Sequence, residues 1–492
     1  MTIGSEPDIE SRLASHVFVR IAQLQDANIP LFPALHHLRI LKPCSSFDCL
    51  HLLLSSALTT LELQGTAIDG PDPHYSSLLS FFECVVDEAP DLSTLILGPG
   101  EIKSQIIQKS MAYNNLRRFE LLGVCAITDR LLRDMGSLQC LEELVLRDKE
   151  NLDIEQHTIS TRSIFAAPLG METSYDSSLF SFDFGATSSA PSAFQPQPTH
   201  EVSSVSWVCS TESKLSVRHP LFRALRSLEV VGVSSLNLIQ DLLEEVSSSV
   251  LKELSLDLTK ILVEESLETI NSLTCFENAE FRVETALTSL LKRSVEKWNH
   301  TLVSINITNE HTTTIFIPFE ILLLLPNIQY LRITGFDLDY MLGSLSRLTN
   351  SKLVVLHLPV HSYVSGIPLK ELQSIAMACP QLESLRCRFE DLCNVKIPDP
   401  LSHPLKELSV SDDIGVLQPE ASLKIGHYLD AIFPNIESIA TQDCGKGNNG
   451  GAEAWHFIFG VVRLCQDVRK EDEKRRLKQK VIECSSAINV AT

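Results

Sequence analysis

Seven side chains in the second half of the chain are of types that bind anionic groups or anchor a partner. They are Arg282, Asn306, Tyr330, Arg332, His357, Arg386 and Arg388. An arginine guanidinium donates paired hydrogen bonds to carboxylate or phosphate, and tyrosine is a rigid contact residue. Because the chain carries a formal net charge of −21, a basic cluster on it is unusual. These residues predict a surface for an acidic or phosphorylated segment of a protein partner. Pairing of the arginines with nearby acids such as Glu280, for solubility alone, is the alternative.

Residues for catalysis, metals or cofactors do not occur in recognisable combinations. The sequence has no G-x-S-x-G, H-E-x-x-H or G-x-x-x-x-G-K-[ST] motif. In the glycine-rich stretch 445–451 the lysine is misplaced for a phosphate loop, which favours a flexible connection. The 13 cysteines include no C-x-x-C pair, and the adjacent His36 and His37 would point to opposite faces of a strand. We therefore expect a protein that is not an enzyme and holds no cofactor or metal.

A spaced leucine pattern, L-x-x-L-x-L, predicts the strands that carry the seven residues. Clear copies begin at Leu58, Leu92, Leu141, Leu251 and Leu353, and looser copies substitute other apolar residues. Successive copies begin at positions 225, 251, 276, 302, 328 and 353, which are 25 or 26 residues apart. The last two apolar residues of each copy fall on one face of a strand, and a helical pattern usually follows. A single strand and helix cannot bury their apolar faces, but stacked copies can.

The predicted fold is an α/β leucine-rich-repeat solenoid, or horseshoe, with parallel strands on the concave face and helices on the convex face. About fourteen repeats are expected, including one strand built from Phe276, Ala279 and Phe281. If the fourth and sixth repeat positions point into the core, the third, fifth and seventh face solvent, where the seven residues lie. A general βαβ sheet is the alternative, but its units need about thirty residues or more.

Departures from the repeat divide the chain into five predicted parts. Residues 1–30 flank the array, and 31–149 form a first block of repeats. Residues 150–215 are rich in Ser, Thr, Pro and Gln, which predicts a disordered insertion. A second block spans 216–442, and 443–492 form a capping helix and a charged tail. Trp455, Ile458, Val462 and Cys465 lie at helical spacing, so this helix is expected to cover the end of the core.

Charge and hydropathy predict a cytoplasmic or nuclear location. The first residues are acidic and polar, unlike a secretory signal. The longest apolar stretch, 315–325, contains Pro318 and Glu320 and is too short to span a bilayer. The negative net charge repels phosphate backbones, so neither nucleic acid nor membrane is expected as a partner.

The repeat spacing, the prolines before several strands and the closing aromatic helix resemble the leucine-rich-repeat region of F-box proteins, particularly large fungal families. The copy that begins at Leu116 is followed by Ile127-Thr128-Asp129, similar to the I-T-D of a cysteine-containing repeat subtype, with Val124 at the usual cysteine position. The resemblance implies that the repeats capture a substrate for a cullin–RING ubiquitin ligase, whose adaptor binds a separate F-box. No Leu-Pro-x-Glu opening precedes the first repeat at Leu35. The box is therefore lost or missing from an incomplete N-terminus, or the ligase link does not hold.

A regulator of a small GTPase is the second function considered, because leucine-rich-repeat activators of Ran-type GTPases exist. That function calls for an arginine presented in trans and a strongly acidic tail. The stretch 469–480 is mixed and net basic, which counts against it.

Overall fold

A computed structural model describes the chain in segments. They are residues 2–3, 20, 30–41, 47–64, 68, 72–99, 102–123, 129–147, 221–233, 235–261, 276–309, 315–317, 319–338, 352–360, 366–390, 392, 396–411, 417–442 and 449–491. The chain divides into two units, one of residues 1–155 with 220–492 and one of residues 156–219. The predicted insertion 150–215 and most of the flanking segment 1–30 lie outside the described residues.

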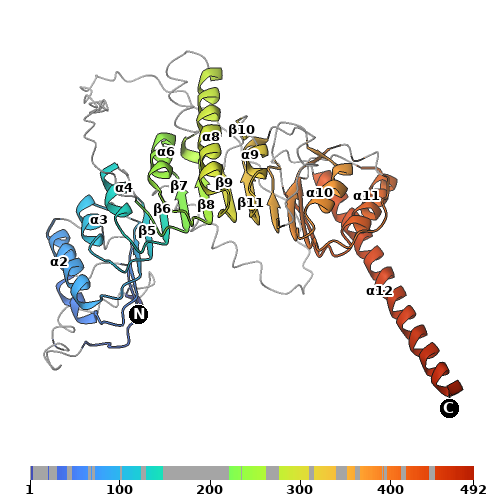
Figure 1. The fold of residues 1–492 in the computed structure, drawn as a ribbon, viewed down its shortest axis with the longest axis horizontal. Helices are drawn as coiled ribbons and strands as arrows, with labels where there is room; N and C mark the ends of the chain where they lie inside the picture. Colours follow the sequence, from blue (N-terminus) through green and yellow to red (C-terminus); the bar gives the residue numbers. More distant parts are fainter. Residues whose placement is uncertain are drawn as a thin grey trace, which may run out of the picture. The chain divides into compact units, whose positions relative to one another are not determined.

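In the described segments, fourteen strands form one parallel sheet in which the strands follow each other in chain order (Figure 1). They are β1 (Thr2–Ile3), β2 (His37–Ile40), β3 (Thr60–Leu63), β4 (Thr94–Leu97), β5 (Arg118–Leu122), β6 (Glu143–Arg147), β7 (Ser227–Val231), β8 (Glu253–Asp257), β9 (Ser304–Thr308), β11 (Tyr330–Thr334), β13 (Val355–His357), β15 (Ser384–Cys387), β17 (Glu407–Ser411) and β18 (Ser438–Gln442). Two further parallel pairs join β10 (Phe316–Ile317) to β12 (Asp337–Leu338) and β14 (Ile367–Pro368) to β16 (Phe389–Glu390). Because β6 pairs directly with β7, the strands of the two repeat blocks share one sheet.

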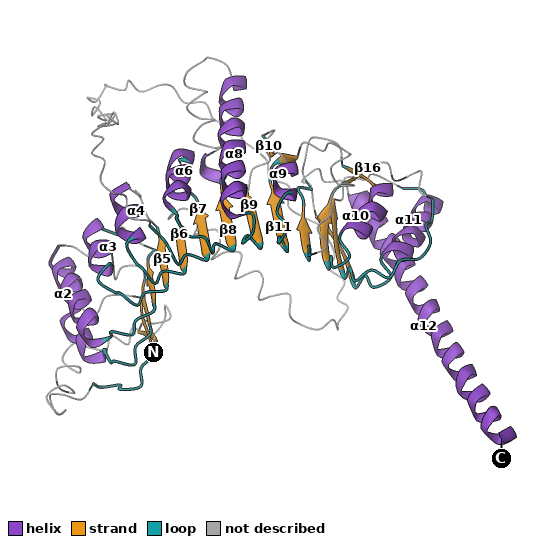
Figure 2. Ribbon diagram, viewed as in Figure 1, coloured by secondary structure: helices purple, strands orange, loops and turns teal. Residues whose placement is uncertain are grey.

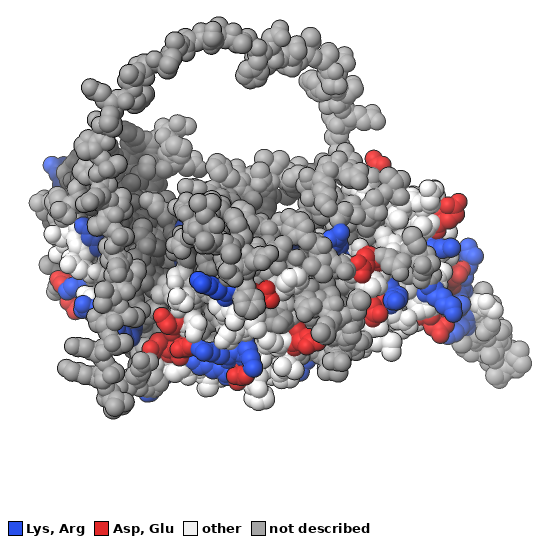
Figure 3. Space-filling model, turned by 90° about the horizontal axis from the view of Figure 1, so that it is seen from above, with Lys and Arg blue, Asp and Glu red and all other residues white. Residues whose placement is uncertain are grey.

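Apart from the C-terminal helix α12 (Asn449–Ala491), the described helices lie on one side of the sheet (Figure 2). They are α2 (Asp72–Glu88), α3 (Ser104–Ser110), α4 (Asp129–Gly136), α6 (Leu236–Glu245), α8 (Phe276–Trp298), α9 (Phe319–Leu323), α10 (Leu372–Ala378) and α11 (Pro419–Ile432), with 3-10 turns η1 (Phe47–Leu53) and η5 (Leu369–Glu371). None of these helices covers the other side of the sheet, which we call the open face. Seen from above, the described surface carries Lys and Arg next to Asp and Glu, so its charge is mixed (Figure 3).

Alternation along each strand decides which side chains reach the core. Leu61 and Leu63 of β3 are fully buried, as are Leu95 and Leu97 of β4, which pair with them. The prediction that the fourth and sixth repeat positions point inward is confirmed from β2 to β17. The last strand differs, because Thr441 of β18 is exposed. The architecture is therefore an α/β leucine-rich-repeat solenoid, with one sheet strand in each coil.

Backbone hydrogen bonds hold successive coils in the same register. At the start of β3, the amides of Thr59 and Thr60 both donate to the carbonyl of His36, at 2.9 and 3.0 Å. The same forked bond recurs in the coils up to β18, where Glu437 and Ser438 donate to a carbonyl of the preceding coil. Each coil therefore starts its strand at the same height, and equivalent repeat positions align across the sheet.

The predicted strand at Phe276, Ala279 and Phe281 is wrong. These residues lie in α8, and β8 pairs directly with β9. Leu254 is paired with Ile305, 51 residues later, so one long coil replaces two of the expected length. The error has a physical origin, because apolar residues three apart fit a helix as well as the start of the repeat pattern.

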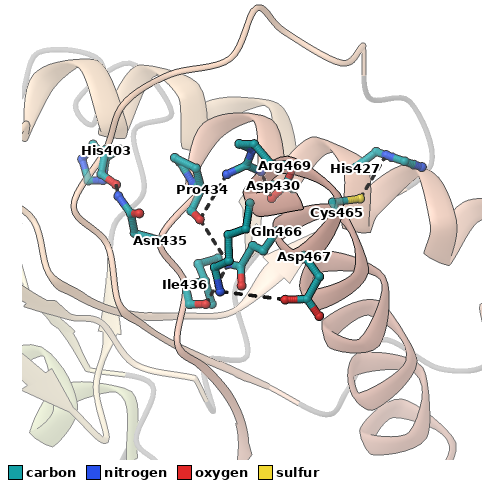
Figure 4. Close-up of polar contacts among 11 residues, drawn as sticks. His403, His427, Asp430, Pro434, Asn435, Ile436, Cys465, Gln466, Asp467 and Arg469 are labelled. Atoms are coloured by element: carbon teal, nitrogen blue, oxygen red, sulfur yellow. Dashed lines mark hydrogen bonds and ion pairs between the residues drawn. The ribbon is translucent and has the colours of Figure 1, made fainter. Parts of the chain in front are cut away.

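The C-terminal helix α12 (Asn449–Ala491) packs against α11 and β18. Trp455, Ile458 and Val462 are buried, and Cys465 is half-buried with its Sγ 3.5 Å from His427 Nδ1. Gln466 Nε2 donates to the carbonyl of Ile436 at 2.9 Å, ahead of the last strand (Figure 4). This helix therefore covers the core at the end of the sheet.

Candidate functional site

Side chains of the open face form lateral rows, with one residue from each strand of the large sheet from β2 to β18, because the parallel strands pair without a shift in register. We call one of these the middle row. It runs Arg39, Glu62, Ile96, Glu120, Val145, Glu229, Ser255, Asn306, Arg332, His357, Arg386, Ser409 and Ala440. The acids of the row lie between β3 and β7, next to Arg39 on β2, and three consecutive basic residues lie on β11, β13 and β15.

Acids in the first half of the open face are paired with arginines of the same face. The ion pairs are Arg39–Glu62, Arg118–Glu120, Arg118–Glu143 and Arg147–Glu229. The closest atoms of Arg147 and Glu229 are 2.8 Å apart, and Glu62 is only 8% exposed. Arginines here do pair with neighbouring acids, so this half is internally neutralised and offers little charge to a partner.

The second half of the row holds Arg332, His357 and Arg386, which we call the basic cluster. In the described part of the chain, none of the three forms an ion pair with an acid. Arg332 is exposed, whereas His357 and Arg386 are half-buried. His357 Nε2 lies 3.1 Å from Ser384 Oγ, and Arg386 Nη2 donates to Gln442 Oε1. Arg386 Nε is buried and has no hydrogen-bond partner among the described atoms, so the guanidinium keeps donor capacity.

Burial and the flanking arginines lower the pKa of His357 to about 4. Desolvation is the largest cause, and the positive charges of Arg332 and Arg386 add to it. Burial also lowers the pKa of Arg386. At neutral pH the cluster therefore holds a neutral imidazole between two guanidinium groups.

Replacing Arg332 with glutamine is expected to raise the pKa of His357 from about 4 without reaching the ordinary 6.5, because burial and Arg386 still lower it. The measurement is an NMR titration of isotope-labelled histidine, with the His357 signal assigned through His357→Gln. Arg223→Gln is the control, since Arg223 is an exposed arginine in the coil of β7. A His357 pKa that stays at about 4 in Arg332→Gln would contradict the electrostatic coupling.

The structure places most of the sequence-predicted site residues on the open face. Asn306 on β9 donates to Ser255 Oγ at 3.0 Å. Tyr330 on β11 is 40% exposed, and Arg388 is half-buried directly after β15. Arg282 is the exception: it is exposed on α8 and does not belong to the sheet.

Two residues that touch the basic cluster were missed from the sequence, namely Ser384 and Gln442. Gln442 occupies the seventh position of the weak last repeat, Ile436/Ile439/Thr441, so the repeat pattern held a signal for it. Ser384 precedes the fourth repeat position of its own copy, and the sequence alone gave no reason to single it out.

Basic residues also gather where the neighbouring strands begin. Lys252, His300 and Lys352 help to line an open cavity of about 310 Å³, which has no acidic residue among its described lining. Lys352 Nζ donates to Asn327 Oδ1 at 2.6 Å. This cavity borders the coils of β8, β9, β11 and β13, so the basic character of the second half extends beyond the middle row.

Metal and membrane chemistry find no support in the described segments. Within them, no group of three or more His, Cys, Asp or Glu residues could hold a metal ion. No helix of the described chain combines the length and the apolar character needed to cross a bilayer. The chemistry that the open face offers is hydrogen bonding and charge.

The sheet topology and the register define the class of this protein as a leucine-rich-repeat solenoid, with a basic cluster on its open face. No protein-family model matches the chain, and no curated protein matches it. Among solved structures it is similar to the LRR protein LIC12759 of Leptospira interrogans. The two are 12% identical, the match covers 86% of this chain and 88% of that one, and the TM-score is 0.33.

Proposed function

We propose that this chain is a non-enzymatic protein-binding module that holds an acidic or phosphorylated segment of a partner on its open face. The observation that carries the proposal is the basic cluster, in which Arg332, His357 and Arg386 stand side by side on consecutive strands. An anion on these side chains would gain charge-assisted hydrogen bonds, which are about twice as strong as neutral ones. Tyr330, exposed beside them, offers a rigid apolar contact.

The distribution of charge along the middle row supports this placement. A segment with negative charge would meet acids at the level of Glu62 and Glu229, although these are paired with arginines. At the basic cluster the same segment would meet cations that pair with no described acid. Electrostatic complementarity of this kind speeds association and fixes the register of a bound chain.

Charge reversal at Arg332 tests the proposal. Arg332→Glu is expected to weaken binding of acidic and phosphorylated peptides on an array by about tenfold or more, because it removes one charge-assisted contact and adds a repulsive charge. Arg332 is exposed, so the substitution leaves the core intact. Arg223→Glu is the matched control, with the same charge change on an exposed arginine of another coil. Unchanged peptide binding by Arg332→Glu would overturn the proposal.

We infer a finer role from the resemblance to F-box proteins: substrate receptor of a cullin–RING ubiquitin ligase. The repeat spacing and the Ile127-Thr128-Asp129 motif support it, although Ile127 and Thr128 lie outside the described residues. This role entails a cytoplasmic or nuclear location, which a fluorescent fusion would test. In affinity purification with mass spectrometry, a cullin and its adaptor should accompany the protein. Recovery of a small GTPase in their place would favour the regulatory alternative.

A further inference from the structure

The two arginines of the basic cluster flank one histidine. Arg332 is paired in register with His357, and His357 with Arg386, on three adjacent strands. Adjacent parallel strands lie about 4.8 Å apart, so the three side chains stand next to one another on the open face. The Arg386 guanidinium donates to Gln442 on β18, on the side away from His357. Burial is the main cause of the low pKa of His357, and the charges of both arginines lower it further.

The groups that face His357 from the neighbouring strands include no acid. From β11 they are Tyr330, Arg332 and Thr334, and from β15 and the residue after it Ser384, Arg386 and Arg388. The titratable or charged groups among them are Tyr330 and the three arginines, and none of them is a carboxylate. Among the described residues, no carboxylate adjoins Arg332, His357 or Arg386 in register, since the next residues along the middle row are Asn306 and Ser409.

Two buried hydrogen-bond donors without partners among the described residues also lie next to each other beside the basic cluster. Arg386 Nε and Ser409 Oγ are buried, and neither has a hydrogen-bond partner in the described chain. The two residues are neighbours in register, on β15 and β17. Buried donors without partners are costly, and the same holds for the Nε atoms of Arg39 and Arg147 in the first half of the sheet.

We propose that the basic cluster is the binding site for a phosphate monoester, carried by a phosphorylated side chain of the partner segment, and that His357 takes up a proton when the phosphate binds. This inference rests on the proposed function and names the chemistry of its ligand. A carboxylate carries one negative charge and compensates only one of the two flanking arginines. A phosphate monoester carries about −1.5 to −2 near neutral pH and three acceptor oxygens, which suits two guanidinium groups and an imidazolium.

Proton uptake follows from the charge balance. The bound phosphate opposes the effect of the arginines, so the pKa of His357 should rise from its low value toward or above the ordinary one. The proton comes from the solvent and adds to the free ring nitrogen. A protonated ring donates from both nitrogens, which allows one bond to Ser384 Oγ and one to the phosphate.

Two degenerate peptide libraries, with a central phosphoserine or a central aspartate, provide the probes. Fluorescence anisotropy with the full chain should show about tenfold or tighter binding of the phosphoserine library, and Arg332→Gln should weaken that binding by about tenfold to a hundredfold. Equal binding of the two libraries, with both weakened by Arg332→Glu, would overturn the proposed phosphate specificity. The proposed binding of acidic segments on the open face would still hold. If Arg332→Glu weakens neither, the proposed function fails as well.

Proton coupling is measured by titration calorimetry of the phosphoserine library in two buffers of different ionisation enthalpy. The phosphate itself tends to lose its proton between two arginines, and this release is common to the wild type and His357→Gln. The difference between the two proteins therefore isolates His357. We expect the wild type to take up more protons than the variant near pH 6.5. Equal proton uptake by the two proteins would overturn the coupling.

Discussion

Replacing Trp455 with alanine is expected to lower the free energy of unfolding by about 3–5 kcal/mol and to release α12 from the last strand. The indole is 1% exposed, and its Nε1 donates to the carbonyl of Ser411 at 3.0 Å. Its ring centre lies 5.9 Å from that of Phe389. The substitution leaves a cavity under the helix and removes the indole donor from the Ser411 carbonyl. In a solenoid each coil is sheltered mainly by its neighbours, so the last coils lose most.

Urea denaturation measures the loss, and hydrogen exchange locates it. Amides of β17 and β18 should lose protection before those of β3 and β4. Phe457→Ala is the matched control, because Phe457 is an aromatic residue of the same helix that is 49% exposed. Its cost should stay within about 0.5 kcal/mol. Equal destabilisation by the two substitutions would mean that α12 does not cap the core.

The core strands could be predicted because each is marked by a short sequence pattern that recurs along the chain. Each strand buries two apolar residues that are two positions apart, and a single sequence shows this spacing directly. β1 could not be predicted, because Thr2 and Ile3 form only a two-residue pairing with β2. The agreement between about fourteen predicted repeats and fourteen sheet strands is therefore coincidental: β1 was missed, and a strand was wrongly placed in α8.

The failure at α8 shows the limit of spacing alone. Val283, Leu287 and Leu290 continue the apolar series at steps of four and three and are buried, which is the signature of one helix. The predicted strand used Phe276 and Ala279, which are the first two residues of this helical series. Arg282 was therefore predicted to lie on the open face, but it lies on α8. Comparing how far the helical period of 3.6 residues and the strand period of two residues each extend along this segment would have distinguished a helix from a strand.

The open-face residues could be predicted in part because a constant register turns repeat positions into rows. The sequence could not show which group each arginine binds. Arg147 and Arg386 occupy the open face alike, yet Arg147 is paired with Glu229, and Arg386 donates to the amide of Gln442. That difference depends on which side chains meet across strands far apart in the sequence. The depressed pKa of His357 likewise depends on burial between neighbouring coils.

Replacing Gly335 with alanine is expected to cost roughly 2–6 kcal/mol, from backbone strain and overpacking together. Gly335 follows β11, the strand that carries Arg332, and has a φ of +78°, which favours glycine. A Cβ at this position would lie 1.9 Å from the carbonyl oxygen of Asn309 in the preceding coil. Asn309 is itself buried and donates through Nδ2 to the Gly335 carbonyl at 3.2 Å. Neither backbone can give way without breaking the register between β9 and β11.

Gly460→Ala is the control, and it should have the opposite sign. Gly460 lies within α12, where a new Cβ meets nothing within 4 Å. Alanine is better than glycine in a helix interior by about 1 kcal/mol, so this variant should be slightly more stable than the wild type. Chemical denaturation of both variants tests the pair. A Gly335→Ala protein as stable as the wild type would show that the coils of β9 and β11 do not approach as closely as the geometry requires. The alignment of Asn306 with Arg332 would then need revision as well.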